Sequence, residues 1–143
     1  MQKPRVLFLC TGNSARSQMA EALLRAYAGD RFEVHSAGVN AKGHILAEVL
    51  VVMKELGIDM QGQRSKDVSE FLGKLHFAHV ITVCGNAERS CPSVFLNMGT
   101  HEHWPFDDPA DFAGSDSDRL DRTREVRDQI ALHIREWLEF QTN

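Results

Sequence analysis

The sequence lacks several features that would place a protein in a specialised class. It has only ten glycines and four prolines among its 143 residues, too few for a fibrous or low-complexity chain. It also has no excess of basic residues. The formal net charge is −4, whereas surfaces that bind nucleic acid or anionic membranes are usually basic. We therefore expect neither a nucleic-acid partner nor a membrane partner.

Long hydrophobic runs are absent too. The apolar run near the amino terminus covers Val6 to Cys10, which is shorter than the roughly 7–15 residues of a signal-peptide core. No stretch approaches the roughly 20 apolar residues of a membrane span.

There are three cysteines, and an odd number argues against a disulfide scaffold. We expect a soluble, cytoplasmic monomer whose cysteines are packed thiols, metal ligands or reactive groups.

What the chain does have is a hydrophobic fraction of 43%, enough to form a core. Apolar runs predict strands at Arg5–Cys10 and Val80–Cys84, and alternation predicts a short strand at Phe32–Ser36. Helical spacing predicts helices at 20–29 and 46–57, a short one at 71–75, and a long final helix with its apolar residues between 126 and 138 on one face. The last long helix has Asp116, Ser117 or Asp118 as candidate N-caps, and residues 92–117 read as irregular. This alternation predicts one α/β domain over residues 1–143, with a parallel sheet and helices on both faces.

The first strand runs directly into a motif of the form Cys-x5-Arg. Its loop consists of Cys10, Thr11, Gly12, Asn13, Ser14, Ala15, Arg16 and Ser17. In open α/β sheets, ligands bind beyond the carboxyl ends of the strands, which is where this loop lies. A loop that leads into a helix N-terminus directs backbone N–H groups at one place and so forms an anion site.

The residue types in this loop suit a nucleophile beside a bound oxyanion. The Arg16 guanidinium is a planar fork that can hold two oxygens of a tetrahedral anion. The same positive field would stabilise a thiolate at Cys10 and make it nucleophilic at neutral pH. Ser17 could donate a hydrogen bond to that sulfur, and Asn13 could brace the loop. The alternative is that Cys10 is an ordinary buried thiol at a strand end.

These residues resemble a known family. The segment CTGNSARSQMAEA and the following Ser36-Ala37-Gly38 are similar to the low-molecular-weight protein tyrosine phosphatase superfamily. The resemblance implies a small four-stranded parallel sheet with the Cys-x5-Arg loop after its first strand. It also implies a general acid from a late Asp-Pro pair, here Asp108-Pro109, which would protonate a departing oxygen. On its own, Asp108 could equally be a turn residue before proline.

Two further cysteines separate this chain from a simple phosphatase. Cys84 ends the other buried strand, and Cys91 follows seven residues later. If the two strands are neighbours, about 4.8 Å apart, Cys84 can reach the site of Cys10. A phosphatase needs no such thiols, whereas a reductase needs a source of two electrons. No G-x-G-x-x-G nucleotide-binding motif is present, and we expect no tightly bound cofactor.

With the EHWPFDDPA stretch at 102–110, the three cysteines resemble the thioredoxin-coupled arsenate reductases. The resemblance implies that Cys10 attacks arsenate with Asp108 as acid. Cys84 would then attack Cys10 and release arsenite, and Cys91 would attack Cys84, leaving a disulfide for thioredoxin to reduce. Arsenate and thioredoxin are thus the implied partners.

A geometric expectation follows for the implied Cys84–Cys91 disulfide. If residues 85–90 are helical in the reduced protein, the two cysteines lie about 10.5 Å apart along the helix axis. A disulfide needs Cα atoms roughly 4.4–6.8 Å apart. Oxidation would therefore unwind this segment.

Two other functions remain open from the sequence. One is an aryl-phosphate or phosphotyrosine phosphatase that uses Cys10, Arg16 and Asp108 alone. The other is a non-enzymatic thiol protein that binds an oxyanion or senses redox state. The chain departs from the tyrosine phosphatases because Ala110 and Asp111 stand where they often carry tyrosines.

The sequence contains residues for two candidate metal sites. Some reductases of the resembled family bind potassium through residues that match Asn13, Glu21 and Ser36, together with an aspartate. Here Lys66 aligns with that aspartate, with Asp67 adjacent, and a lysine ammonium would repel or replace the cation. A zinc site from Cys84, Cys91, His101 and His103 is disfavoured, because zinc ligand pairs normally sit closer in sequence. We expect no metal.

Overall fold

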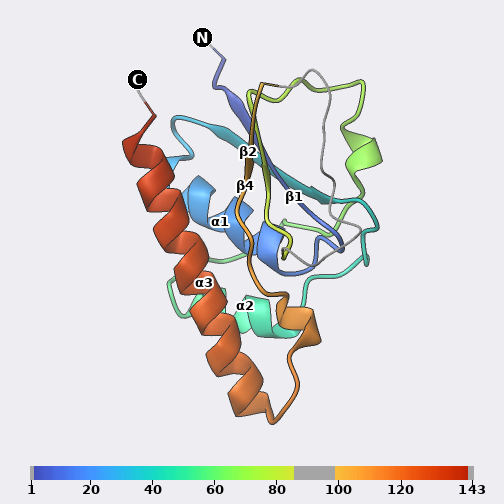
Figure 1. The fold of residues 1–143 in the computed structure, drawn as a ribbon, viewed down its shortest axis with the longest axis vertical. Coiled ribbons are helices and arrows are strands. Elements are labelled where there is room, and N and C mark those ends of the chain that lie inside the picture. Colours follow the sequence, from blue (N-terminus) through green and yellow to red (C-terminus); the bar gives the residue numbers. More distant parts are fainter. Residues whose placement is uncertain (1, 86–98, 142–143) are drawn as a thin grey trace.

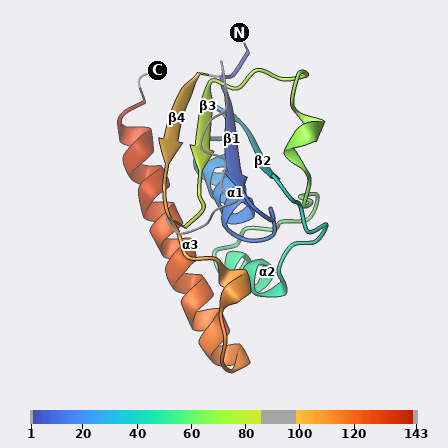
Figure 2. The ribbon, with the colours of Figure 1, turned by 45° about the vertical axis from the view of Figure 1, so that its right-hand side comes forward.

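The computed structural model describes residues 2–85 and 99–141. Four strands form one parallel sheet: β1 (Arg5–Cys10), β2 (Glu33–Gly38), β3 (His79–Thr82) and β4 (Thr100–His103). Their order across the sheet is β2-β1-β3-β4, and every pairing is parallel. Figure 2 shows the four arrows side by side, all pointing towards the end of the molecule where α2 lies. The predicted four-stranded parallel sheet is confirmed.

Strand β1 is central, and its sequence explains why. Residues Val6 to Cys10 are all buried, as expected of an apolar run covered on both faces. In the register with β2, Cys10 lies opposite Gly38, and in the register with β3, Leu9 lies opposite Thr82. The amide of Val83 donates to the carbonyl of Leu9 at 2.8 Å, so pairing continues beyond the end of β3. The carboxyl ends of β1 and β3 are therefore adjacent.

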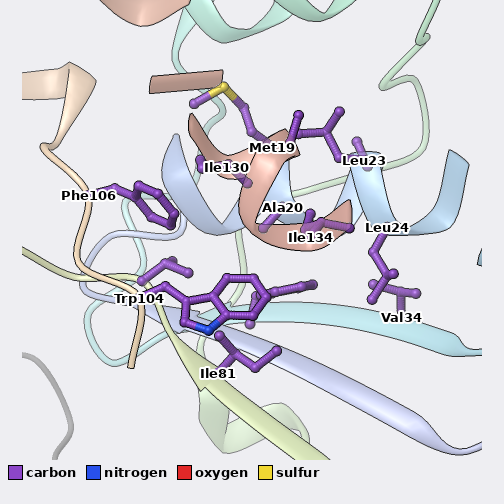
Figure 3. Close-up of a cluster of buried hydrophobic side chains, with 14 of the residues drawn as sticks. Met19, Ala20, Leu23, Leu24, Val34, Ile81, Trp104, Phe106, Ile130 and Ile134 are labelled. Carbon is purple, nitrogen blue, oxygen red and sulfur yellow. The ribbon is translucent and has the colours of Figure 1, made fainter. Parts of the chain in front are cut away.

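Two long helices cover one face of the sheet. They are α1 (Arg16–Ala28) and α3 (Asp116–Glu139), which lie on the same side of the strands in Figure 1. The shorter α2 (Ala47–Lys54) packs against α3 near the carboxyl edge. Figure 3 shows part of the resulting core, to which Leu23 of α1, Ile134 of α3 and Ile81 of β3 all contribute. These three side chains are fully buried.

The opposite face is covered by a shorter segment. It contains the 3-10 helix η1 (Val68–Glu70) and continues to Phe77, whose side chain is fully buried. The second hydrophobic cluster on this face consists of Leu7, Leu9, Ala37, Val68, Phe77 and Val80. Within the described ranges, no helix is long and apolar enough to cross a membrane.

Several local predictions were wrong. The stretch expected to be irregular contains β4 and a 3-10 helix, η2 (Pro109–Asp111). Strand β4 has no buried residue and no apolar pattern, so only pairing with β3 creates it. The short helix expected at 71–75 is a hydrogen-bonded turn that follows η1. The N-cap of α3 is Ser115, which forms a capping box with Asp118. The strand expected at Val80–Cys84 begins one residue earlier and ends at Thr82.

Candidate active site

The loop after β1 is held from outside by the segment that follows β2. The carbonyls of Cys10, Thr11 and Gly12 accept hydrogen bonds from the amides of residues 39, 40 and 42, at 3.2, 2.9 and 2.9 Å. The carbonyl of Ser14 accepts from Leu46 at 2.9 Å. Carbonyls held outward in this way leave the amide N–H groups of a loop disposed towards its interior, which is the arrangement that binds anions. The backbone thus supports the predicted oxyanion loop.

The sulfur of Cys10 lies inside this loop and receives hydrogen bonds. The backbone amide of Asn13 donates to Sγ at 3.2 Å, and Ser17 Oγ lies 2.8 Å from Sγ. Since Asn13 Nδ2 donates to the same Ser17 oxygen at 2.8 Å, the single hydroxyl proton of Ser17 is available for the sulfur. Hydrogen bonds donated to a sulfur favour its anionic, nucleophilic form.

A chain of buried polar groups continues from Ser17 away from the sulfur. The second N–H of Asn13 Nδ2 donates to Ser36 Oγ at 3.0 Å, and Ser36 Oγ donates to Glu21 Oε1 at 2.5 Å. We call this chain the thiol network; its members are Cys10, Ser17, Asn13, Ser36 and Glu21. All five side chains are buried. The hydrogen bond between each side chain and its neighbour in the network therefore fixes how both are oriented.

Arg16 and Asp108 face each other at the same site. The Arg16 side chain is fully buried, although it is the first residue of α1. Its NH1 donates to the carbonyl of Phe106 at 3.1 Å, and its NH2 lies 3.2 Å from Asp108 Oδ2. The other oxygen of Asp108 accepts from the amide of Ala110 at 3.0 Å and so caps η2. The segment after β4 thereby places the Asp108 carboxyl group next to the Arg16 guanidinium.

The second cysteine lies at the same edge of the sheet as the first. Cys84 is fully buried, two residues after β3 ends, and belongs to the same hydrophobic cluster as Cys10. Among the described residues Cys10 is the free thiol, whereas the sulfur of Cys84 is disulfide-bonded. Cys91 and the expected unwinding of residues 85–90 lie outside the described residues, except for Gly85. Those expectations remain predictions.

The residues matched to a potassium site do lie together, but a lysine stands among them. Lys66 Nζ is 3.4 Å from Ser36 Oγ and 3.6 Å from Glu21 Oε1. Burial lowers the pKa of Lys66, while the Glu21 carboxylate opposes this effect. The carboxylate of the adjacent Asp67 instead caps η1 by accepting from Ser69. The site therefore does not fit potassium, because an ammonium takes the position that the cation would need.

Three contacts that hold the loop were not predicted from the sequence. Gln18 Nε2 donates to Asn13 Oδ1 at 2.9 Å, and the backbone amide of Lys66 donates to the same oxygen at 2.9 Å. Gly38 lies against the loop, where a Cβ would come within 2.5 Å of the Thr11 carbonyl oxygen. Gly38 was noted only as part of a resemblance, although a glycine at the end of a strand signals close backbone approach.

The two histidines of the disfavoured zinc set belong to the edge of the sheet. His101 and His103 are exposed residues of β4, and His103 Nδ1 lies 2.7 Å from Thr82 Oγ1. Within residues 2–85 and 99–141, no group of three or more His, Cys, Asp or Glu side chains is placed to hold a metal ion.

Comparison with known proteins identifies the class. Residues 5–142 match the family described as low molecular weight phosphotyrosine protein phosphatase. The chain therefore belongs to this family, as its Cys-x5-Arg loop and four-stranded parallel sheet also indicate.

The similar proteins within this family include arsenate reductases. The chain is 42% identical over 140 residues to an arsenate reductase from Halalkalibacterium halodurans, covering 97% of this chain and 98% of that protein. A solved structure of an arsenate reductase in the phosphate binding state superimposes with a TM-score of 0.75 at 28% identity, covering 95% and 97% of the two chains. A thioredoxin-dependent arsenate reductase from Corynebacterium glutamicum gives a TM-score of 0.68 at 30% identity, over 96% of this chain and 61% of that one.

The close approach of Gly38 to the loop generates a testable prediction. In Gly38→Ala, the new methyl group would meet Thr11 O at 2.5 Å and Asn13 N at 3.0 Å, so the loop must shift. We expect the affinity for inorganic phosphate to fall about tenfold to a hundredfold, because displacing an oriented site by 1 Å is that costly. Isothermal titration calorimetry measures this affinity.

Gly73→Ala is the matched control. A methyl group at Gly73 meets no atom within 4 Å, although the backbone φ is +76°. This variant should lose stability through backbone strain and retain the parent affinity for phosphate. An unchanged affinity in folded Gly38→Ala would show that the contact does not hold the loop in place.

Proposed function

We propose that this protein is a thioredoxin-coupled arsenate reductase in which Cys10 is the nucleophile. The observation that carries the proposal is a free, buried Cys10 in the same loop as Arg16, which pairs with Asp108, and a buried Cys84 two residues beyond the neighbouring strand β3. The arsenate reductases that are similar over nearly the whole chain support the same reaction. A phosphatase would use the first loop but would have no task for Cys84.

Substrate binding follows from shape and charge. Arsenate is a tetrahedral oxyanion close to phosphate in size and charge, so an anion loop suits it. The amides of the loop and the Arg16 guanidinium would hold its oxygens. Because Arg16 NH1 is fixed on the carbonyl of Phe106, the plane of the guanidinium is set before the anion arrives. Such preorganisation lowers the cost of binding.

In the first chemical step, the Cys10 thiolate attacks arsenic and forms a sulfur–arsenic bond. One arsenate oxygen leaves as water, and Asp108 donates the proton that it needs. Ser17 and the amide of Asn13 hold the thiolate before the attack, since both lie within hydrogen-bond distance of Sγ. Arsenic is still pentavalent at this point.

In the second step, the Cys84 thiolate attacks the sulfur of Cys10. A disulfide bond forms, the sulfur–arsenic bond breaks, and its electron pair stays on arsenic, which leaves as arsenite. Cys91 then attacks Cys84 and releases the Cys10 thiolate, and a dithiol of thioredoxin reduces the new disulfide. A free Cys10 together with a disulfide-bonded Cys84 is the state that this sequence of exchanges reaches before thioredoxin acts. The cycle requires a reducing compartment such as the cytoplasm.

The decisive experiment is an arsenate-dependent NADPH oxidation assay with thioredoxin and thioredoxin reductase. The proposal requires sustained oxidation by the parent protein and none by Cys10→Ser, because a serine hydroxyl is not ionised at neutral pH. No turnover with arsenate, together with robust hydrolysis of an aryl phosphate, would assign the protein to the phosphatases instead. Stoichiometric oxyanion binding without either reaction would assign it to the non-enzymatic binders.

Cys84→Ser should separate the two chemistries. Arsenate reduction should stop, because no thiol remains to break the sulfur–arsenic bond. Weak aryl-phosphate hydrolysis should persist, since it needs only Cys10, Arg16 and Asp108. Both rates are measured on the same preparation, with circular dichroism as the check on folding. Equal loss of both activities in a folded variant would contradict the division of roles.

Cys91→Ser should allow about one turnover per enzyme molecule and then stall. The variant can still form the Cys10–Cys84 disulfide, but it has no thiol to resolve it. Quantifying arsenite per enzyme in a single-turnover experiment tests this, and mass spectrometry of a proteolytic digest identifies the trapped disulfide. Repeated turnover with thioredoxin would remove Cys91 from the mechanism.

A further inference from the structure

Lys66 is a buried lysine that the chemistry above does not use. Its side chain is 9% exposed. Nζ donates to the carbonyl of Arg64 at 3.0 Å and to Ser36 Oγ at 3.4 Å, and it lies 3.6 Å from Glu21 Oε1. The ammonium thus contacts two members of the thiol network at the end remote from Cys10.

Burying a cation is unfavourable unless an anion compensates for it, and Glu21 is that anion. The Glu21 side chain is 7% exposed, and its second oxygen pairs with Arg25 NH2 at 2.5 Å. Arg25 is 46% exposed, so water screens its charge more than that of Lys66. The remaining charges that act on Lys66 are Arg64 and Glu70, which pair with each other. Lys66 is therefore the buried cationic neighbour of Glu21 among the described residues.

The charge on Glu21 decides how the thiol network is oriented. An ionised carboxylate can only accept, so Ser36 donates its proton to Glu21 and accepts from Asn13. The Asn13 amide is then held with Nδ2 towards Ser17, and the Ser17 proton is left for the sulfur. The Lys66 ammonium lies against both ends of this Ser36–Glu21 hydrogen bond. Without it, the bond loses its neighbouring cation and donor, and the order of the thiol network is less constrained.

We propose that the Lys66 ammonium is a built-in cation that keeps the thiol network ordered, and that Lys66 is thereby a positioning residue for Cys10. Lys66 contacts neither the sulfur nor the anion loop through its side chain. Its backbone contacts with Asn13 and Gly38 survive a side-chain substitution, so the ammonium can be tested by itself. The inference rests on the proposed function only for the role of Cys10 as nucleophile.

The test uses the full chain with Cys84→Ser and Cys91→Ser, which leaves Cys10 as the only cysteine. The rate constant for alkylation by iodoacetamide is measured at pH 6 and at pH 9, because the thiolate is the reacting form. In Lys66→Met we expect the ratio of the rate at pH 6 to that at pH 9 to fall about fivefold, as neighbouring charge and hydrogen bonds set the thiolate fraction. No arsenate turnover is needed, so failure here is distinct from failure of the proposed function.

Lys74→Met is the matched control, because it removes the same charge from an exposed lysine and should leave the ratio unchanged. Lys66→Arg retains the charge and should stay near the parent, whereas Lys66→Gln should behave like Lys66→Met and serves as the neutral variant if Lys66→Met does not fold. A parent-like ratio in a folded, neutral Lys66 variant overturns the proposal. So does an equal fall in rate at both pH values, which would indicate a purely structural role.

Discussion

The hydrogen bonds of the Asn13 side chain tie together the polar groups around the Cys10 sulfur. Its Nδ2 donates to Ser17 of α1 and to Ser36 of β2, and its Oδ1 accepts from Gln18 and from the backbone of Lys66. One amide thus joins the Cys-x5-Arg loop to a helix, a strand and the segment before η1. The backbone of Asn13 has a φ of 48°, a left-handed conformation that asparagine tolerates better than most residues. That conformation also brings the Asn13 amide to the sulfur.

The parallel sheet explains why site residues from distant parts of the sequence lie together at one edge. Since β1 pairs with both β2 and β3, the residues that follow these three strands emerge together. Cys10 ends β1, Gly38 ends β2, and Cys84 comes two residues after β3. The segment that follows strand β4 contains Phe106 and Asp108, and both residues contact Arg16. Ligands bind at such edges in open α/β sheets generally.

A charge pair lies on either side of the Cys10 sulfur, and the two pairs differ in exposure. Arg16 with Asp108 lies on the side where an oxyanion would bind, with Asp108 partly exposed at 20%. Lys66 with Glu21 lies on the opposite end of the thiol network, and both side chains are less than 10% exposed. The first pair can exchange partners when an anion arrives, because Arg16 can turn a hydrogen bond from a carboxylate to a bound oxygen. The second pair is enclosed, so its charge acts on the sulfur only through the groups between them.

The sequence by itself determined the elements whose signal is local. The apolar run of β1, the Cys-x5-Arg spacing and the helical periodicity of α1 and α3 are all written in neighbouring residues. Tertiary structure alone decided the rest. Strand β4 is made of exposed, mostly polar residues and exists because β3 offers it an edge. The roles of Gln18 and Gly38 depend on atoms that are distant in sequence, and Lys66 becomes an internal cation only where folding places it beside Glu21. Side-chain periodicity reports which face of an element is buried, but not which polar group it will meet there.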